Sequence, residues 1–350
     1  MLVYFWNEIK ILDIQNFLHM KIIKYIKMQK NTSVHYNKLL FFVIVLVAIF
    51  SGNAQQDPQY TQYMYNTQVI NPAYAGSKDV LSFGLLYRTQ WVGLEGAPKT
   101  GTFTIDSPIG SLDKMGLGLT IVRDELGPSI NSNITVDYSY SINTSLTSQL
   151  SFGIKAGVDI LDVDFSRLNI ADPGDIFETN IENKVSPQIG AGIYFNTYKF
   201  YAGLSVPNFL DTDHFDESTL IDPETSQSIG SSTAKDRLHY FFIAGYVFDL
   251  GENLKFKPAT MFKAVAGSPL QADMSFNFLL YEKLTLGTGY RWDAALSALA
   301  GFQFTDQIFI GFGYDFATTE IKSYSGGSYE FMLRFDVFNK PERILTPRFF

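Results

Sequence analysis

Apolar and polar residues alternate along most of the chain after residue 80. In the segment 329–337 the odd positions hold Tyr, Phe, Leu, Phe and Val, while the even positions hold Glu, Met, Arg and Asp. The segments 134–140 and 272–278 show the same split. A period of two is typical of β-strands that have one apolar and one polar face. The pattern predicts an all-β fold.

Turn-forming residues divide this region into fourteen predicted strands. They lie near residues 80–90, 100–108, 116–124, 130–142, 148–163, 186–195, 199–206, 238–250, 254–265, 270–280, 284–292, 294–304, 308–316 and 328–338. Aromatic residues with a polar tip stand near the strand ends, as is typical of a membrane interface: Tyr87, Trp91, Tyr194, Tyr201, Tyr246, Tyr281, Tyr290, Trp292 and Tyr314. A sheet in lipid can leave no unpaired edge. We therefore expect a transmembrane antiparallel β-barrel of about fourteen strands.

The connections between the predicted strands alternate in length. Tight links at 196–198, 251–253, 282–283 and 305–307 separate long loops at 164–185, 207–237 and 317–327. Outer-membrane barrels have short periplasmic turns and longer outer loops. Both ends of the barrel are therefore expected on the periplasmic side.

The first 54 residues are predicted to be a secretory signal. A lysine-rich stretch leads into an apolar run at 39–50, and the small residues of 51–54 follow as a cleavage site. The run is too short to span a bilayer as a helix. We expect cleavage after Ala54, with Met20 or Met28 as possible true starts. A retained amphipathic anchor is the alternative.

Composition narrows the possible functions. The chain has no cysteine and a net charge of −8, which excludes thiolate chemistry and gives nucleic acid no basic surface to bind. His214 and His239 are the two histidines beyond the leader. The spacing of the residues around them does not indicate a catalytic nucleophile, so we predict no enzyme and no cofactor. The acidic segment 211–217 could hold Ca²⁺ but is predicted to be a solvated loop, and 172–175 is predicted to be a turn.

Charged residues on the polar phase of the strands are expected to face the lumen. They could line an aqueous path, but a salt-bridged interior that supports the barrel is the favoured interpretation. The set comprises Asp137, Lys155, Asp159, Lys257, Lys263, Asp273, Arg291, Asp315, Glu330, Arg334 and Asp336.

The segment between the leader and the first strand carries a family resemblance. Its motif residues are Asp57, Pro58, Gln62, Tyr63, Asn71, Pro72, Ala73, Tyr74 and Gly76, and the motif continues through Arg88, Gln90, Trp91, Gly93, Ala97 and Pro98. These residues resemble the PorP/SprF family of type IX secretion membrane proteins of Bacteroidota. Later stretches at 257–263, 267–275, 289–291, 313–316 and 327–336 are also similar to the family, although Tyr329 stands where a His is expected.

The resemblance implies a non-enzymatic outer-membrane component that supports export or surface anchoring of large secreted proteins such as gliding adhesins. Its expected partners are outer-membrane lipid, periplasmic and outer-membrane secretion components, and a large cell-surface protein. A porin or hydrophobic-compound channel is the alternative. From the residues alone, 55–79 is a periplasmic docking strip, a lumen plug or a loose tether. Residues 339–350 are expected to be a periplasmic tail.

Overall fold

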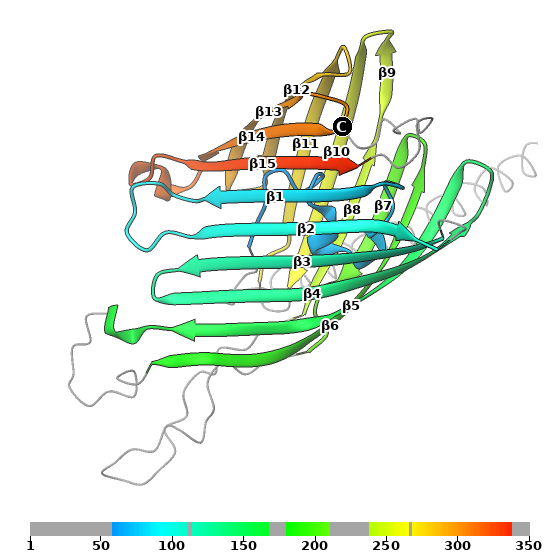
Figure 1. Ribbon diagram of the computed structural model, residues 1–350. Helices are drawn as coiled ribbons and strands as arrows, with labels where there is room; N and C mark the ends of the chain where they lie inside the picture. Colours follow the sequence, from blue (N-terminus) through cyan, green and yellow to red (C-terminus); the bar gives the residue numbers. More distant parts are fainter. Residues whose placement is uncertain (1–57, 111–113, 168–179, 211–237, 266–267, 338–350) are drawn as a thin grey trace, which may run out of the picture. The chain divides into compact units, whose positions relative to one another are not determined.

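The computed structural model describes residues 58–110, 114–167, 180–210, 238–265 and 268–337, and these residues form a closed antiparallel β-barrel (Figure 1). The barrel strands are β1 (Leu81–Thr89), β2 (Lys99–Ile109), β3 (Met115–Leu126), β4 (Ser129–Asn143), β5 (Ser148–Val163), β6 (Ile181–Thr197), β7 (Phe200–Val206), β8 (His239–Tyr246), β10 (Leu254–Val265), β11 (Gln271–Leu280), β12 (Leu284–Arg291), β13 (Ala295–Gln303), β14 (Ile308–Ala317) and β15 (Ser328–Val337). These fourteen strands confirm the predicted fold class.

Pairing between the first and last strands helps to close the barrel. Strand β1 pairs with β15 from Leu81↔Val337 to Thr89↔Tyr329, and β10 pairs with both β8 and β11. The short strand β9 (Phe248–Gly251) pairs with β10 alone. It arises because the predicted strand 238–250 is interrupted at Val247, which is fully buried and donates its N–H to the Lys199 carbonyl.

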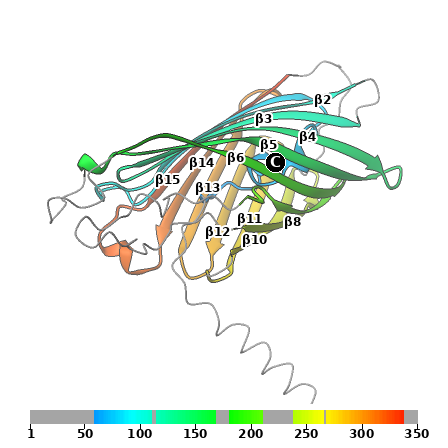
Figure 2. The same cartoon turned by 90° about the horizontal axis from the view of Figure 1, so that it is seen from below.

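The two ends of the barrel differ in their connections. At the end where β1 begins and β15 finishes, hairpins such as β11–β12 and β13–β14 close with short links, and we call this the turn end. The opposite end, the loop end, carries the β5–β6, β7–β8 and β14–β15 connections, and the last of these includes the short helix η5 (Glu320–Ser323). Figure 1 shows β1 pointing to the loop end and β15 to the turn end, and Figure 2 shows the barrel from below.

The predicted alternation between an apolar outer face and a polar inner face is present in the strands. In β15 the side chains of Tyr329 and Phe331 are exposed, whereas Glu330 and Asp336 are buried in the lumen. Two of the expected interface aromatics are an exception: Tyr194 and Tyr201 are only 2% and 4% exposed and face inward. Their inward phase gives them ring contacts inside the barrel.

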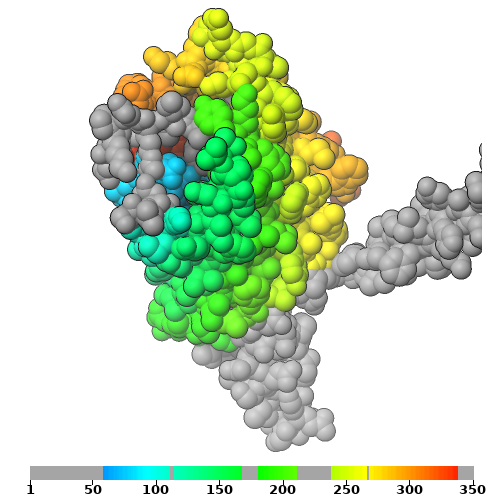
Figure 3. Space-filling model, turned by 90° about the vertical axis from the view of Figure 1, so that its right-hand side faces the viewer, coloured from blue at the N-terminus to red at the C-terminus, as the bar shows by residue number. Residues whose placement is uncertain are grey.

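Residues 58–80, which we call the inner segment, lie inside the barrel. The segment contains one turn of helix, α2 (Thr67–Ile70), and the 3₁₀ turn η1 (Pro72–Tyr74). Nearly all of its side chains are buried, and most of the apolar ones form one cluster with inward-facing residues of the wall such as Phe241 and Met332. Figure 3, which looks at the turn end, shows blue atoms from the first part of the described chain next to the green atoms of the middle strands.

Within the part of the chain that the structure describes, no helix is long and apolar enough to cross a membrane. The predicted leader (1–54), the residues 55–57 and the predicted tail (339–350) lie outside the described residues. So do the acidic segment 211–217 and the predicted turn 172–175.

Candidate functional site

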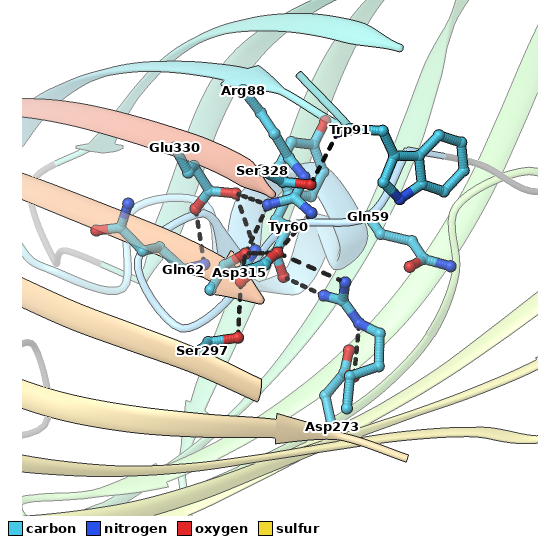
Figure 4. Close-up of polar contacts among 12 residues, drawn as sticks. Gln59, Tyr60, Gln62, Arg88, Trp91, Asp273, Ser297, Asp315, Ser328 and Glu330 are labelled. Carbon is cyan, nitrogen blue, oxygen red and sulfur yellow. Dashed lines mark hydrogen bonds and ion pairs between the residues drawn. The ribbon is translucent and has the colours of Figure 1, made fainter. Parts of the chain in front are cut away.

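The first half of the inner segment binds a pair of buried carboxylates on the wall. The Glu330 carboxylate accepts the backbone N–H groups of Thr61 at 2.9 Å and of Gln62 at 2.7 Å. The Thr61 hydroxyl donates to Asp315, at 2.8 Å and 2.7 Å from its two carboxylate oxygens. Figure 4 shows these contacts converging on strands β14 and β15. The wall therefore holds the segment through the backbone of residues 61 and 62.

Two arginines neutralise these carboxylates, and we call Arg88, Arg291, Asp315 and Glu330 together the ionic anchor. Arg88 on β1 lies 2.6 Å from Asp315 and 3.4 Å from Glu330, its cross-strand partner. Arg291 pairs with Asp273 at 2.9 Å and donates to the Tyr60 carbonyl at 3.3 Å. Because a buried charge is stable only when it is paired and hydrogen-bonded, this arrangement supports the barrel and the segment together.

A second ion pair meets the middle of the segment on the opposite wall. The Lys155 ammonium lies 3.5 Å from the Asp137 carboxylate and donates to the Val69 carbonyl at 3.0 Å. The Gln68 amide nitrogen donates to Asp137 at 3.2 Å. Asp137 and Lys155 face each other across β4 and β5 because they are register partners. This pair thus binds the side chain of Gln68 and the backbone of Val69 in the short helix α2.

The second half of the segment is held mainly by hydrogen bonds that involve backbone carbonyls. Asn71 caps η1 by accepting the Ala73 N–H at 3.0 Å and donates to the Ile193 carbonyl at 3.0 Å. Ser205 donates to the Ile70 carbonyl and Ser139 to the Ala75 carbonyl, both at 2.7 Å. Residues 70–75 are therefore fixed to β4, β6 and β7 by uncharged groups.

Polar contacts at the turn end fix the last residues of the segment. The Gly76 N–H donates to Asp106 at 2.8 Å. Lys78 donates to Ser82 at 2.7 Å, and Ser82 in turn donates to Asp336 at 2.6 Å. Burial lowers the pKa of the Lys78 ammonium, while the nearby Asp336 carboxylate opposes that shift.

Wall glycines allow the second half to approach the strands closely. A Cβ atom at Gly153 would lie 2.1 Å from the Ala73 nitrogen, and one at Gly116 would lie 2.0 Å from the Ala75 oxygen. A Cβ at Gly192 would meet the Asn71 side chain. These contacts are shorter than any side chain tolerates, so the wall is shaped to the segment at these positions.

Comparison with known proteins assigns the chain to a family. The family model described as type IX secretion system membrane protein PorP/SprF matches residues 52–335, which is most of the chain. This chain belongs to the PorP/SprF family. It is therefore an outer-membrane component of type IX secretion, as the motif residues predicted. No curated protein matches it.

Solved structures similar to this PorP/SprF chain include an outer-membrane protein and a hydrocarbon channel. Omp33 of Acinetobacter baumannii is 9% identical, with 74% of this chain and 100% of that chain covered and a TM-score of 0.41. The CymD monoaromatic hydrocarbon channel is 12% identical, with coverages of 80% and 94% and a TM-score of 0.46. A FadL homologue of Pseudomonas aeruginosa is 11% identical, with coverages of 83% and 97% and a TM-score of 0.42.

The PorP/SprF motif residues form two groups in the structure. Of the first group, Asp57 lies outside the described residues, whereas Pro58, Gln62, Tyr63 and 71–76 lie in the inner segment. The second group, from Arg88 to Pro98, forms the end of β1 and the corner that leads into β2. There the Trp91 N–H donates to the Ser328 hydroxyl at 3.2 Å. All of these residues that the structure describes make contacts within the chain.

The predicted lumen charges all lie on strands and point inward. Among the described residues, ion pairs join Asp137 to Lys155, Arg291 to Asp273, and Arg334 to Asp336. Lys257 and Lys263 also lie over aromatic rings, Tyr65 at 5.2 Å and Phe241 at 5.7 Å. No group of three acidic or histidine side chains that could hold a metal ion occurs in the described part of the chain.

Several contributors to the site were not predicted. Thr61 and Gln68 were not singled out within the segment, nor were Ser139 and Ser205 on the wall. The inward-facing glycines Gly116, Gly153 and Gly192 were missed as well. Their signal is present in the sequence, because each glycine occupies the polar phase of its strand, where a lumen-facing side chain would otherwise stand.

Proposed function

We propose that this PorP/SprF protein is a non-enzymatic barrel whose lumen stays filled by the inner segment, and that it supports export or surface anchoring of large secreted proteins through contacts with protein partners. Membership of the family supports a role in secretion. The role in anchoring particular adhesins comes from the resemblance of the motif residues and is part of the proposal.

The observation that carries the proposal is how firmly the inner segment is bound to the wall. Residues 61 and 62 bind the ionic anchor, residues 68 and 69 bind the Asp137–Lys155 pair, and residues 70–76 bind β2, β4, β6 and β7. Displacing the segment would leave buried charges and carbonyls without partners, at a cost of roughly 1–3 kcal/mol for each unsatisfied group. A filled lumen favours a role in binding protein partners over a role as an open channel.

The alternative is a channel that conducts after the inner segment moves. The two possibilities differ in whether the segment must leave its place during function. A disulfide between the segment and the wall distinguishes them. The chain has no native cysteine, so the double variant Ala75→Cys/Gly118→Cys can form only the intended bond. A Cβ at Gly118 would lie 3.4 Å from the Ala75 Cβ, close to the roughly 3.5–4.5 Å of disulfides.

The experiment compares cells that carry the double variant with and without oxidation, and follows surface display of secreted proteins. We expect the oxidised protein to support display as well as the reduced one, and the purified oxidised protein to remain non-conducting in planar bilayers. The single variants Ala75→Cys and Gly118→Cys serve as controls for the substitutions. Loss of display on oxidation, restored by reductant, would favour the channel.

A capture experiment tests the partner contacts. Tagged full-length protein pulled from intact, cross-linked envelopes should recover periplasmic or outer-membrane secretion components and a large secreted protein. Recovery of barrel protein alone, together with a steady single-channel current from the purified wild-type protein, would sink the proposal.

A further inference from the structure

A hollow lies on the loop side of the inner segment, next to the contacts that hold the segment to the wall. Its volume is about 260 Å³, and residues Tyr60, Val69 and Ile70 of the inner segment line it from the turn-end side. The walls come from β3, β4, β5, β6 and β8. We call it the loop-side hollow, and it is a cup whose base is the inner segment.

The lining of the loop-side hollow is rich in amide side chains. Asn131, Asn133, Gln188 and Asn208 all line it, together with the rings of Tyr60 and Phe241. Asn133 donates to Asp159 at 3.4 Å and also to Gln188. The Asn131 side-chain oxygen is buried and has no hydrogen-bond partner among the described residues. A buried acceptor of this kind requires a donor from a ligand or from water.

A second hollow of about 480 Å³ adjoins the first, since both are lined by Pro58, Asp124 and Leu126. It is also lined by the indole of Trp91 and by Gln90 and Gln59. Figure 4 shows Trp91 and Gln59 beside the ionic anchor. Two adjoining hollows of this size give room for a small ligand, because ligand sites typically measure about 300–1,000 Å³.

The chemistry of the lining selects among ligand classes. An apolar ligand would bury the amides without partners, which is costly. An anion would face Asp124 and Asp159, while Lys155, the one lysine among the described residues that line the hollow, is already paired with Asp137. Hydroxyl groups donate and accept hydrogen bonds as amides do, and aromatic rings offer flat apolar faces to pack against a sugar ring.

We propose that the loop-side hollow binds a short neutral saccharide, with Asn131 accepting a ligand hydroxyl and the rings of Tyr60 and Phe241 packing against the sugar face. The inference does not depend on the proposed role in secretion. It would give the loop end of the barrel a ligand site of its own, separated from the turn end by the inner segment.

The test uses purified full-length protein in a detergent that carries no sugar headgroup. Titration calorimetry measures binding of three probes, the linear trisaccharides of glucose, mannose and N-acetylglucosamine. We expect at least one of them to bind with millimolar affinity or better. The tripeptide Gly-Lys-Gly, which would suit the two aspartates as a cation, is titrated in parallel.

Substitutions at Asn131 separate the possible ligands. Asn131→Leu removes the acceptor and should weaken trisaccharide binding about tenfold, which corresponds to one lost hydrogen bond. Asn131→Asp keeps an acceptor and should change it by less than about threefold. Val69→Phe narrows the base of the hollow and should weaken the same probe. The matched control Asn143→Leu changes an exposed asparagine at the turn end and should have no effect.

Either of two outcomes would overturn the proposal. One is that no trisaccharide binds, or that binding is unchanged in both Asn131→Leu and Val69→Phe. The other is that Gly-Lys-Gly binds more tightly than every trisaccharide and gains affinity in Asn131→Asp, which would make the hollow a site for cationic peptides.

Discussion

The two halves of the inner segment are bound to the barrel by different physical means. Residues 58–66 depend on the ionic anchor, in which two arginines and two carboxylates are almost completely buried. Residues 70–75 depend on hydrogen bonds from uncharged side chains to carbonyls and on wall glycines that permit close approach. Charged wall groups contact the segment again on either side of this stretch, at residues 68, 69, 76 and 78.

The difference predicts how each half responds to a change in the wall. Buried charges interact strongly but require every partner, since removal of one leaves another unpaired. Contacts that depend on shape are individually weaker and are disturbed by added volume. A charge substitution in the ionic anchor should therefore release residues 58–66 alone, and an added methyl group beside residues 70–75 should release that stretch alone.

The largest effect is expected for Arg88→Met. The substitution leaves Asp315 and Glu330 without their nearest cation, and loss of one partner of a buried ion pair typically costs about 3–5 kcal/mol of unfolding free energy. Urea unfolding in lipid vesicles would measure the loss. Amide hydrogen exchange should accelerate in residues 59–66 and stay slow in residues 69–76.

The control for Arg88→Met is Lys255→Met, which breaks the surface pair between Lys255 and Glu282. Exposed pairs contribute less than about 1 kcal/mol, so stability should hardly change. If Arg88→Met accelerated exchange equally along the whole inner segment, the two halves would not be independent.

A smaller effect is expected for Gly153→Ala. The added methyl group would overlap the backbone at Ala73, and overpacking of this kind costs about 1–3 kcal/mol. Exchange should accelerate in residues 69–76 while residues 59–66 keep their protection. The matched control is Gly101→Ala on β2, where a Cβ would have no atom within 4 Å. Equal effects of the two substitutions would contradict a fitted wall.

The smallest effect at neutral pH is expected for Tyr65→Phe, which tests whether the end of the first half is sealed from water. Burial raises the pKa of the Tyr65 hydroxyl to about 12, from its ordinary value of 10.0. The unfolded chain therefore loses this proton at lower pH than the folded chain. The stability that the buried, protonated Tyr65 hydroxyl contributes is fully present below pH 10 and is lost as the pH rises towards 12.

The measurement for Tyr65 is the urea midpoint as a function of pH, with tyrosinate absorbance as a second readout. The wild-type midpoint should fall more steeply between pH 10 and 12 than that of Tyr65→Phe. Identical profiles would show that folding leaves the pKa of Tyr65 unchanged, and hence that its hydroxyl is not sealed from water.

The sequence predicts the barrel well because its pattern is local. Alternation of the kind seen at 329–337 requires only that one face of the strand meets lipid and the other meets the lumen. Each strand shows this alternation in its own residues. The interruption at Val247 could not be predicted, because its buried position depends on a hydrogen bond to the Lys199 carbonyl on a neighbouring connection.

The candidate site was predictable only in part. The inward charges follow from strand phase, but which carboxylate meets which arginine depends on register between distant strands. Tyr194 and Tyr201 show the limit most clearly, since an aromatic residue near a strand end suits either the interface or the lumen. Tyr201 packs against Tyr194, and Tyr194 against Tyr74, a contact that only the path of the inner segment decides.

The hydrogen bond from Gln62 to Glu330 joins residues 268 positions apart in the chain. Contacts of such long range slow folding, because the chain entropy of closing the loop is lost before the contact forms. The residues that bind the inner segment are distributed from β1 to β15, so its final position cannot be reached until the last strand is present. The inner segment can therefore take its final position only after β15 has formed. Closure of the barrel and placement of the segment become one late step in assembly.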